Sequence, residues 1–281
     1  MEHRTHRRNF LKAGAVAGAG VLILRSGMLR GADAPSNKLN IACIGVGGRG
    51  AADMGGVAGE NIVALCDLNE QNLAAAAKKY PKAQTYADWR KCLGQKDIDA
   101  VVCATTDHTH AFVNVWAMNR GKHVYCEKPL ANSVHEARTV REAYLKNKDK
   151  IATQMGTQIH AEDNYRRVVE LIRCGAIGTV KDAHVWCSRT PAGGKYLPAQ
   201  GDPPPHLNWD LWCGPSAVHP FNPGYLGGCL AWNRFWDFGS GQIGDMGSHL
   251  MDLAYWALDL RFPTTCEAQG TPLNTDTCPQ W

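Results

Sequence analysis

The amino-acid sequence predicts an α/β fold whose N-terminal part is a doubly wound parallel β-sheet. Short apolar segments alternate with helical patterns between residues 39 and 146, and a glycine-rich turn directly follows the first apolar segment. This alternation indicates βαβ crossovers, which place helices on both faces of a parallel sheet. Because ligands of such sheets bind beyond the carboxyl ends of the strands, the residues at those ends are the first candidates for a site.

The first 34 residues have the three parts of a bacterial signal peptide. The arginine pair Arg7-Arg8 precedes an apolar run from Ala13 to Leu24, and an Ala-x-Ala sequence ends at Ala34. The arginine pair is typical of the twin-arginine (Tat) type, which predicts export to the periplasm. Twelve apolar residues would span only about 18 Å of a membrane core roughly 30 Å thick, so we predict no stable membrane anchor.

The net charge of the chain comes from this leader. The chain carries a formal charge of +4, and residues 1–34 contribute six basic and two acidic side chains, which leaves 24 of each in the rest. The balanced remainder argues against a nucleic-acid partner. With 44% hydrophobic and 20% charged residues, the composition is that of a globular protein.

Seven segments between the leader and residue 146 are predicted elements. The predicted strands are residues 39–44, 62–66, 100–104 and 123–126. The predicted helices are residues 69–79, 108–119 and 133–146. Each strand contains one cysteine, which we expect to act as a small buried apolar residue. No Cys-x-x-Cys occurs in the sequence, so we predict neither a zinc ribbon nor a disulfide framework.

The turn after the first strand, Gly45-Val46-Gly47-Gly48-Arg49-Gly50, fits the pattern G-x-G-x-x-G between a strand and a helical segment. Gly45 allows a tight turn, Gly47 lets the backbone approach a pyrophosphate, and Gly50 permits close packing of the following helix. The N-terminus of that helix favours the phosphate charge. The pattern therefore predicts a Rossmann-type domain that binds a dinucleotide.

Asp67 ends the second strand, where a carboxylate can accept hydrogen bonds from an adenosine ribose. It would repel a 2′-phosphate, so we predict NAD as the cofactor. The cations Arg49 and Lys38 lie nearby in the sequence and leave NADP as an alternative.

Two polar segments follow the predicted strands at 100–104 and 123–126. They are Thr105-Thr106-Asp107-His108-Thr109-His110 and Glu127-Lys128-Pro129. Each segment also has a purely structural interpretation, in which Thr105 or Asp107 caps the following helix and Lys128 is a solvated surface charge. Asp107, His108 and His110 fall on different faces of a helix start, so we predict no metal site.

Residues 242–259 have helical periodicity, with Asp245 and His249 four residues apart on one face. We expect a different, apolar face to be buried, and it consists of Ile243, Met246, Leu250, Leu253 and Ala257. Oxidation of a hydroxyl requires a group of near-neutral pKa to take the proton and a cation to stabilise the developing alkoxide. His249 suits the first role and Lys128 the second, while Asp245 can orient the histidine or hold a neighbouring hydroxyl.

In their order along the chain, these segments resemble the Gfo/Idh/MocA family of sugar and polyol oxidoreductases, named for glucose-fructose oxidoreductase and inositol dehydrogenase. The resemblance covers most of residues 39–260 and rests on the glycine turn, Asp67, the segment 106–110, Glu127-Lys128-Pro129 and residues 244–252. It departs from the family at Thr106, where many members carry proline, and at Asp107, where asparagine is frequent.

The resemblance implies an exported oxidoreductase with tightly bound NAD, acting on a sugar, a polyol or a sugar derivative. It implies catalytic roles for Lys128, Asp245 and His249. The cofactor contacts that it implies, together with the motifs above, are Gly45, Gly47, Gly48, Arg49, Gly50, Asp67, Thr105, His110, Glu127 and Lys128. Weaker candidates for substrate contacts are His160, Tyr165, Arg189, Lys195 and Tyr196.

We expect three parts: a signal peptide at 1–34, a Rossmann domain at 35–153 and an α+β substrate domain at 154–281. The family's second domain is a large open sheet, whereas the last part offers one convincing strand, at 179–188. We therefore expect a C-terminally truncated, incomplete substrate domain, and homo-oligomers only for a full-length protein. Two other functions stay open: an NAD-dependent glycoside hydrolase acting by transient oxidation and elimination, and a non-catalytic sugar-binding or scaffold protein.

Overall fold

The structure is a computed structural model that describes residues 38–188, 194–270 and 272–278. The described residues from Leu39 onward belong to one compact unit. The predicted signal peptide at 1–34 lies outside the described residues. Among the residues that are described, no helix combines the length and apolar character needed to cross a membrane.

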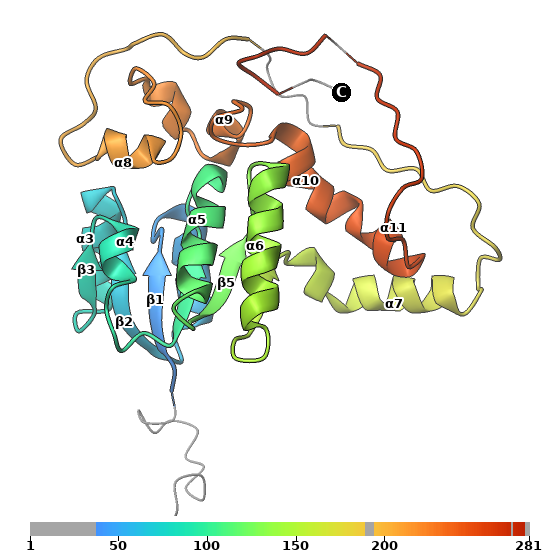
Figure 1. Cartoon of the computed structure of the whole chain (residues 1–281), viewed down its shortest axis with the longest axis horizontal. Helices are drawn as coiled ribbons and strands as arrows, with labels where there is room; N and C mark the ends of the chain where they lie inside the picture. The colour runs from blue at the N-terminus through green and yellow to red at the C-terminus, as the bar shows by residue number, and fades with distance from the viewer. Residues whose placement is uncertain (1–37, 189–193, 271, 279–281) are drawn as a thin grey trace, which may run out of the picture. The chain divides into compact units, whose positions relative to one another are not determined.

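A six-stranded parallel sheet forms the N-terminal half of the unit (Figure 1). The strands are β1 (Asn40–Ile44), β2 (Asn61–Cys66), β3 (Gln84–Tyr86), β4 (Ala100–Cys103), β5 (His123–Glu127) and β6 (Thr153–Gly156). They lie in the order β3-β2-β1-β4-β5-β6, and every neighbouring pair is parallel. This order confirms the predicted Rossmann topology, whose direction of winding reverses between β1 and β4.

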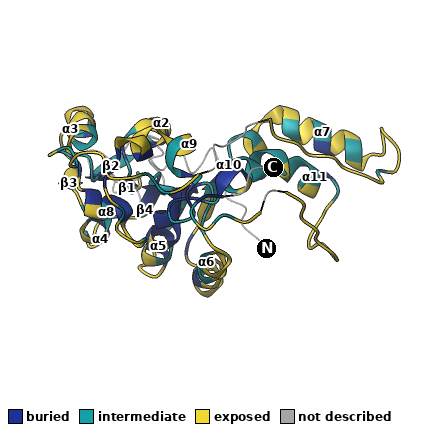
Figure 2. Ribbon diagram, turned by 90° about the horizontal axis from the view of Figure 1, so that it is seen from above, coloured by how far each residue is buried: buried dark blue, intermediate teal, exposed yellow. Residues whose placement is uncertain are grey.

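Helices cover both faces of the sheet, as the βαβ alternation predicts. The helices of this half are α2 (Gly48–Gly56), α3 (Glu70–Lys79), α4 (Trp89–Cys92), α5 (Asp107–Met118) and α6 (Val134–Asn147). Figure 2 shows α2 and α3 on one side of the sheet and α4, α5 and α6 on the other. Each face has its own apolar cluster, one containing Met54 of α2 and the other Val113 of α5. Burial of these two clusters stabilises the sheet that positions the strand ends.

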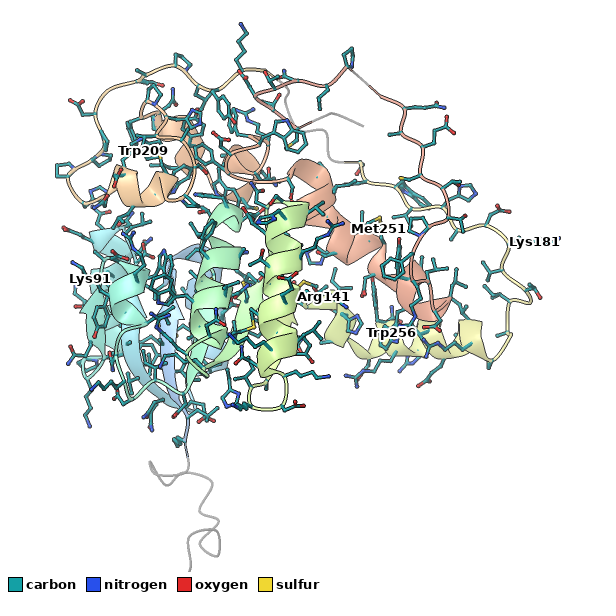
Figure 3. All side chains as sticks on the ribbon, viewed as in Figure 1. Lys91, Arg141, Lys181, Trp209, Met251 and Trp256 are labelled. Carbon is teal, nitrogen blue, oxygen red and sulfur yellow. The ribbon has the colours of Figure 1, made fainter. Side chains whose placement is uncertain are left out.

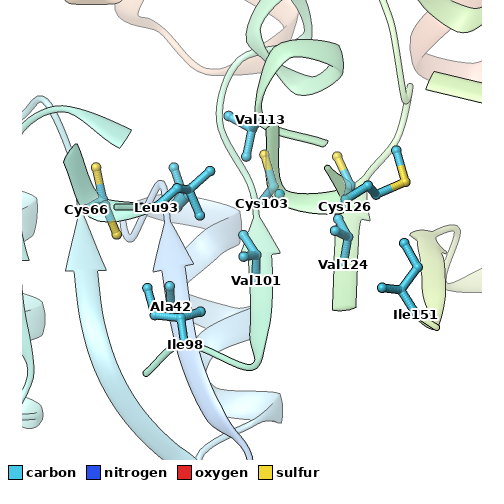
Figure 4. Close-up of a cluster of buried hydrophobic side chains, with 14 of the residues drawn as sticks. Ala42, Cys66, Leu93, Ile98, Val101, Cys103, Val113, Val124, Cys126 and Ile151 are labelled. Carbon is cyan, nitrogen blue, oxygen red and sulfur yellow. The ribbon is translucent and has the colours of Figure 1, made fainter. Parts of the chain in front are cut away.

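The strand cysteines are buried in these clusters, as predicted. Cys66, Cys103 and Cys126 lie in the cluster beneath α4, α5 and α6 (Figure 4), and Cys43 lies in the cluster on the opposite face. The register pairs Cys103 of β4 directly with Cys126 of β5.

The edge strands β3 and β6 lack the continuous apolar pattern that identifies the inner strands. β3 has only three residues, none of them buried, and in β6 only Gly156 is buried. β3 pairs with β2, and β6 pairs with β5, through backbone hydrogen bonds. Apolar periodicity in the sequence does not predict this backbone pairing of edge strands.

Helices and connecting segments make up the described residues after β6. The elements are η2 (Ile159–Ala161), α7 (Asp163–Arg173), α8 (Trp209–Cys213), η3 (Pro223–Leu226), α9 (Cys229–Trp232), α10 (Gly241–Leu250) and α11 (Asp252–Ala257). An aromatic cluster that includes Trp209, Trp212, Tyr225, Phe235 and Phe238 packs the segment 207–238 together (Trp209 is labelled in Figure 3).

Three predictions for this region are wrong. Residues 179–188 form no strand, because no described segment pairs with them, and β-propensity alone does not create a strand. The predicted helix at 242–259 is two helices, α10 and α11, which meet at Met251 (Figure 3). The expected burial of Ile243 is wrong as well: Ile243 is 55% exposed, whereas Ala257 of the same face is buried as expected and Asp245 of the polar face is 5% exposed.

Candidate active site

A cavity of about 530 Å³ lies at the carboxyl ends of β1, β2 and β4. Its other wall comes from the segment 207–232, which is held against the sheet by backbone hydrogen bonds from Asn208 N to Leu68 O and from Glu70 N to His206 O. The volume lies within the range of cavities that hold small-molecule ligands. The cavity therefore occupies the position at which a doubly wound sheet binds a ligand.

The glycine turn forms the floor of the cavity at the end of β1. Gly45 has a φ of +79°, and a side chain there would meet the carbonyl of Ala104 at the end of β4. A side chain on Gly50 would meet the carbonyl of Gly45, so this glycine lets α2 begin directly against the turn. The turn thus leaves room for a pyrophosphate next to the N-terminus of a nine-residue helix, as the motif predicts.

The carboxylate of Asp67 lines the cavity at the end of β2, as predicted. Its two oxygens accept backbone N–H groups, one from Val46 at 2.9 Å and one from Asn69 at 2.8 Å. Burial raises the pKa of Asp67, and these backbone donors oppose that shift. They also fix the orientation of the carboxylate, whose remaining lone pairs can accept ribose hydroxyls.

Arg49 lines the cavity and lies between two carboxylates. Its guanidinium contacts Asp53 Oδ1 at 2.8 Å and Glu127 Oε1 at 3.2 Å, and Tyr125 donates its hydroxyl to the same Glu127 oxygen at 3.2 Å. Burial, followed by the charge of Glu127, raises the pKa of Asp53 to about 6. The two carboxylates orient Arg49. The sequence motif predicts Arg49 as a cofactor contact but does not identify these two partners.

The predicted cofactor residues divide into two groups. Those that line the cavity are Gly45, Gly47, Arg49, Asp67 and Thr105. Those that do not are Gly48, Gly50, His110, Glu127 and Lys128. His110 and Glu127 are almost fully buried, and each supports a lining residue instead: His110 contacts the carbonyl of Thr105, and Glu127 contacts Arg49.

Lys128, which follows β5 directly, contacts Asp245 on α10. The Nζ atom of Lys128 donates to the main-chain carbonyl of Asp245 at 2.8 Å and also to its carboxylate. Both side chains are largely buried, with 14% of Lys128 and 7% of Asp245 exposed. The structure therefore joins two of the three predicted catalytic residues although they are 117 positions apart.

His249 lies on α10 one turn after Asp245. Tyr165 of α7 donates its hydroxyl to the carbonyl of His249 at 2.6 Å, which fixes the end of α10 against α7. Residues four apart on a helix have Cβ atoms about 5–6 Å apart, so Asp245 and His249 are neighbours on the surface of α10.

The weaker substrate candidates have other contacts. His160 stacks on Trp256 and lies 2.7 Å from Asp252, and Tyr196 stacks on His219 with ring centroids 4.0 Å apart. Lys195 is exposed, and Arg189 lies outside the described residues.

The wall of the cavity opposite the sheet contains none of the predicted cofactor residues. Trp212, Cys229 and Trp232 line it. Burial raises the pKa of Cys229, and the charge of Asp245 adds to this rise while that of Lys128 opposes it, so the cavity wall is electrostatically coupled to the Lys128–Asp245 pair. The only sequence signal was the high frequency of tryptophan after residue 186.

The strand order, the glycine turn and the acidic residue at the end of β2 define a dinucleotide-binding Rossmann protein. Residues 39–155 match the family model described as "Oxidoreductase family, NAD-binding Rossmann fold", and residues 180–281 match the model of its C-terminal alpha/beta domain. The chain belongs to the Gfo/Idh/MocA oxidoreductase family. Residues 4–23 match the twin-arginine translocation signal, which confirms the predicted type of leader.

Several relatives are similar in sequence to part of this chain. An inositol 2-dehydrogenase of Salmonella typhimurium is 35% identical over 123 residues, covering 43% of this chain and 36% of the relative. A levoglucosan dehydrogenase of Pseudarthrobacter phenanthrenivorans is 29% identical over 198 residues, covering 68% and 40% respectively. The chain thus spans less than half the length of these relatives. The crystal structure of an oxidoreductase domain protein from Kribbella flavida is 28% identical with a TM-score of 0.56, covering 79% of this chain and 54% of that one.

Proposed function

We propose that this protein is an NAD-dependent dehydrogenase that oxidises a hydroxyl group of a sugar, a polyol or a sugar derivative. The observation that carries the proposal is the pairing of Lys128 with Asp245, close to a cavity whose glycine turn and Asp67 suit a dinucleotide. The names of the relatives, inositol 2-dehydrogenase and levoglucosan dehydrogenase, support this substrate class.

The residues of the cavity fit NAD. The glycine turn brings the N-terminus of α2 directly to the end of β1, which suits a pyrophosphate, and the oriented carboxylate of Asp67 suits ribose hydroxyls. A 2′-phosphate would place negative charge against Asp67, which favours NAD over NADP. When bound, nicotinamide would supply the hydride acceptor.

Each residue of the proposed centre has one role. Lys128, held by Asp245, donates a hydrogen bond to the substrate hydroxyl and stabilises the negative charge that develops on its oxygen. His249 accepts the hydroxyl proton while hydride leaves the carbon that carries this hydroxyl. Asp245 fixes the direction of the Lys128 ammonium group, and its own carboxylate can hold a neighbouring hydroxyl.

The matched Tat signal supports export in the folded state with the cofactor already bound, and we propose the periplasm as the working location. Tight retention of NAD would suit a compartment without a soluble NAD pool. The domain limits 35–153 and 154–281 and the formation of homo-oligomers stay predictions.

The experiment has two parts. Mass spectrometry of the purified protein after denaturation should detect released NAD, and turnover should be observed with a member of a polyol and anhydrosugar panel that includes inositol and levoglucosan. Lys128→Ala and His249→Ala should retain NAD but lose turnover, while Lys146→Ala, which changes an exposed lysine of α6, should lose neither. Wild-type turnover in both catalytic variants would refute the proposal.

Two other outcomes identify the alternative functions. Release of the aglycone from aryl glycosides without net NADH would indicate the glycoside hydrolase. Binding of sugar without turnover or retained cofactor would indicate a binding or scaffold protein.

A further inference from the structure

His110 of α5 is 1% exposed and lies between the ends of two neighbouring strands. Its Nδ1 atom lies 2.6 Å from the carbonyl oxygen of Pro129, and its Nε2 atom lies 3.0 Å from the carbonyl oxygen of Thr105. Thr105 comes two residues after β4 and lines the cavity, whereas Pro129 follows Lys128 after β5. One imidazole ring thus connects the cavity wall to the segment that carries the proposed catalytic lysine.

Both partners of this ring are hydrogen-bond acceptors. A backbone carbonyl has no hydrogen to donate, and a neutral imidazole has only one N–H group, so it can satisfy only one of the two contacts. An imidazolium has two N–H groups and satisfies both. Charge-assisted hydrogen bonds of this kind are shorter and stronger than neutral ones, in keeping with the 2.6 Å contact to Pro129.

The surroundings of His110 supply negative charge that offsets its burial. The Sγ atoms of Cys103 and Cys126 and a ring nitrogen of His110 all lie within 4.8 Å of one another. Burial disfavours the Cys103 thiolate, but the hydrogen bond with Cys126 and the charge of His110 outweigh burial and lower the pKa of Cys103 to about 6. Burial likewise disfavours the charged ring, whereas Cys103 and Asp107 raise the pKa of His110 above its ordinary value.

We propose that His110 is a positioning residue that stays an imidazolium at neutral pH, with the Cys103 thiolate as its counter-ion, and ties the end of β4 to the segment that carries Lys128. The last residue pair that β4 and β5 share is Cys103 with Cys126. Beyond this pair, the two hydrogen bonds of His110 connect Thr105 with Pro129. The effect on Lys128 rests on the function proposed above, whereas the charge state of His110 does not.

A metal ion is the competing occupant, because two thiols and an imidazole are common ligands of zinc. The ring orientation favours the imidazolium: both nitrogens point at carbonyl oxygens at hydrogen-bond distance, which leaves neither free to ligate a metal. An imidazolium–thiolate pair and a bound metal ion therefore require different protonation states of Cys103, Cys126 and His110.

The test is ¹⁵N NMR of the purified protein labelled at histidine. We expect one ring to keep two protonated nitrogens from pH 6 to pH 8. Its signals should disappear in His110→Gln and persist in His135→Gln, which changes an exposed histidine of α6. In Cys103→Ser, where the thiolate is lost, the same ring should release its proton at lower pH.

A neutral His110 at pH 7, or a stoichiometric metal ion in elemental analysis, would overturn the proposal. If His110→Gln does not fold, the resonance that shifts in Cys103→Ser supplies the assignment. None of these measurements requires turnover, so they separate this inference from failure of the dehydrogenase proposal.

The positioning role has its own readout. Loss of the ring contacts should lower kcat by about tenfold to a hundredfold through misplacement of Lys128, with a smaller change in KM. Unchanged kcat in a folded His110→Gln protein, with only its Tm lowered, would show a structural role and contradict positioning.

Discussion

The ammonium group of Lys128 donates to both the main-chain carbonyl and the carboxylate of Asp245. One residue follows the fifth strand of the Rossmann sheet, and the other lies on α10. This contact brings a cation from one part of the chain to a carboxylate from another, close to the cavity beyond the strand ends. It is the basis for treating the two segments as one catalytic centre.

Lys128→Met should abolish turnover and also destabilise the protein. Methionine keeps much of the side-chain volume but leaves the Asp245 carboxylate, which is 7% exposed, without its cation. Breaking a buried pair in this way costs about 3–5 kcal/mol, so the free energy of unfolding measured in urea should fall by a similar amount. Lys128→Met combined with Asp245→Asn should recover part of that stability without recovering turnover. If the double variant were no more stable than the single one, the pair would not carry this energy.

Two glycines of α2 provide a matched comparison. A methyl group on Gly50 would meet the carbonyl of Gly45, whereas one on Gly55 has nothing within 4 Å. Gly50→Ala should destabilise the protein by about 1–3 kcal/mol and weaken NAD binding, because α2 must move away from the turn. Gly55→Ala should stabilise it by up to about 1 kcal/mol through helix propensity. Calorimetric titration with NAD and thermal unfolding measure both effects, and equal behaviour of the two variants would contradict the turn geometry.

Cofactor choice should depend on Asp67. Replacing its carboxylate in Asp67→Ser removes the repulsion of a 2′-phosphate and weakens the contacts with ribose hydroxyls. The ratio of NAD to NADP affinity should therefore fall by at least about tenfold, which corresponds to 1.4 kcal/mol. Measured dissociation constants for both nucleotides test this. An unchanged ratio of NAD to NADP affinity would indicate that the ribose does not contact Asp67.

Asp53 gives a pH dependence of defined sign. Its pKa is raised from 3.8 to about 6 in the folded protein, so between these values the folded state binds more protons than the unfolded state. The contribution of Asp53 to stability is thus present at low pH and is lost as pH rises from about 4 to about 6. Asp53→Asn should remove this loss, whereas Asp163→Asn, which changes a side chain that is 91% exposed, should not. Urea unfolding across this pH range shows whether the slopes differ, and parallel curves for Asp53→Asn and the wild type would refute the assignment.

The parts of the site that are local in sequence could be predicted, and those that depend on distant contacts could not. The glycine turn and Asp67 follow from the strand–turn–helix context. In contrast, Glu127, a partner of Arg49, lies on β5, whereas Arg49 lies on α2. The second partner, Asp53, is local, because it lies four residues after Arg49 on the same helix, but the glycine motif does not identify it. The family resemblance assigned Lys128, Asp245 and His249 to one catalytic centre, but it did not predict the contact between Lys128 and Asp245, because no periodicity relates positions so far apart.

The errors in the fold have a similar origin. Helical periodicity in 242–259 separates a polar from an apolar face, but it does not determine which one packs against the rest of the protein. In the structure the polar Asp245 faces inward to meet Lys128, and Ile243 is exposed. The strand expected at 179–188 required a pairing partner, which a single segment does not specify.

The proposed function depends most on hydride transfer to NAD at the Lys128–Asp245–His249 centre. The most direct measurement is a single turnover with a substrate from the panel that carries deuterium on the reacting carbon, followed by mass spectrometry of the nicotinamide cofactor. We expect deuterated NADH from the wild-type protein and none from Lys128→Met or His249→Gln. Product formed without deuterium in the cofactor, or deuterated NADH formed equally well by both variants, would contradict it.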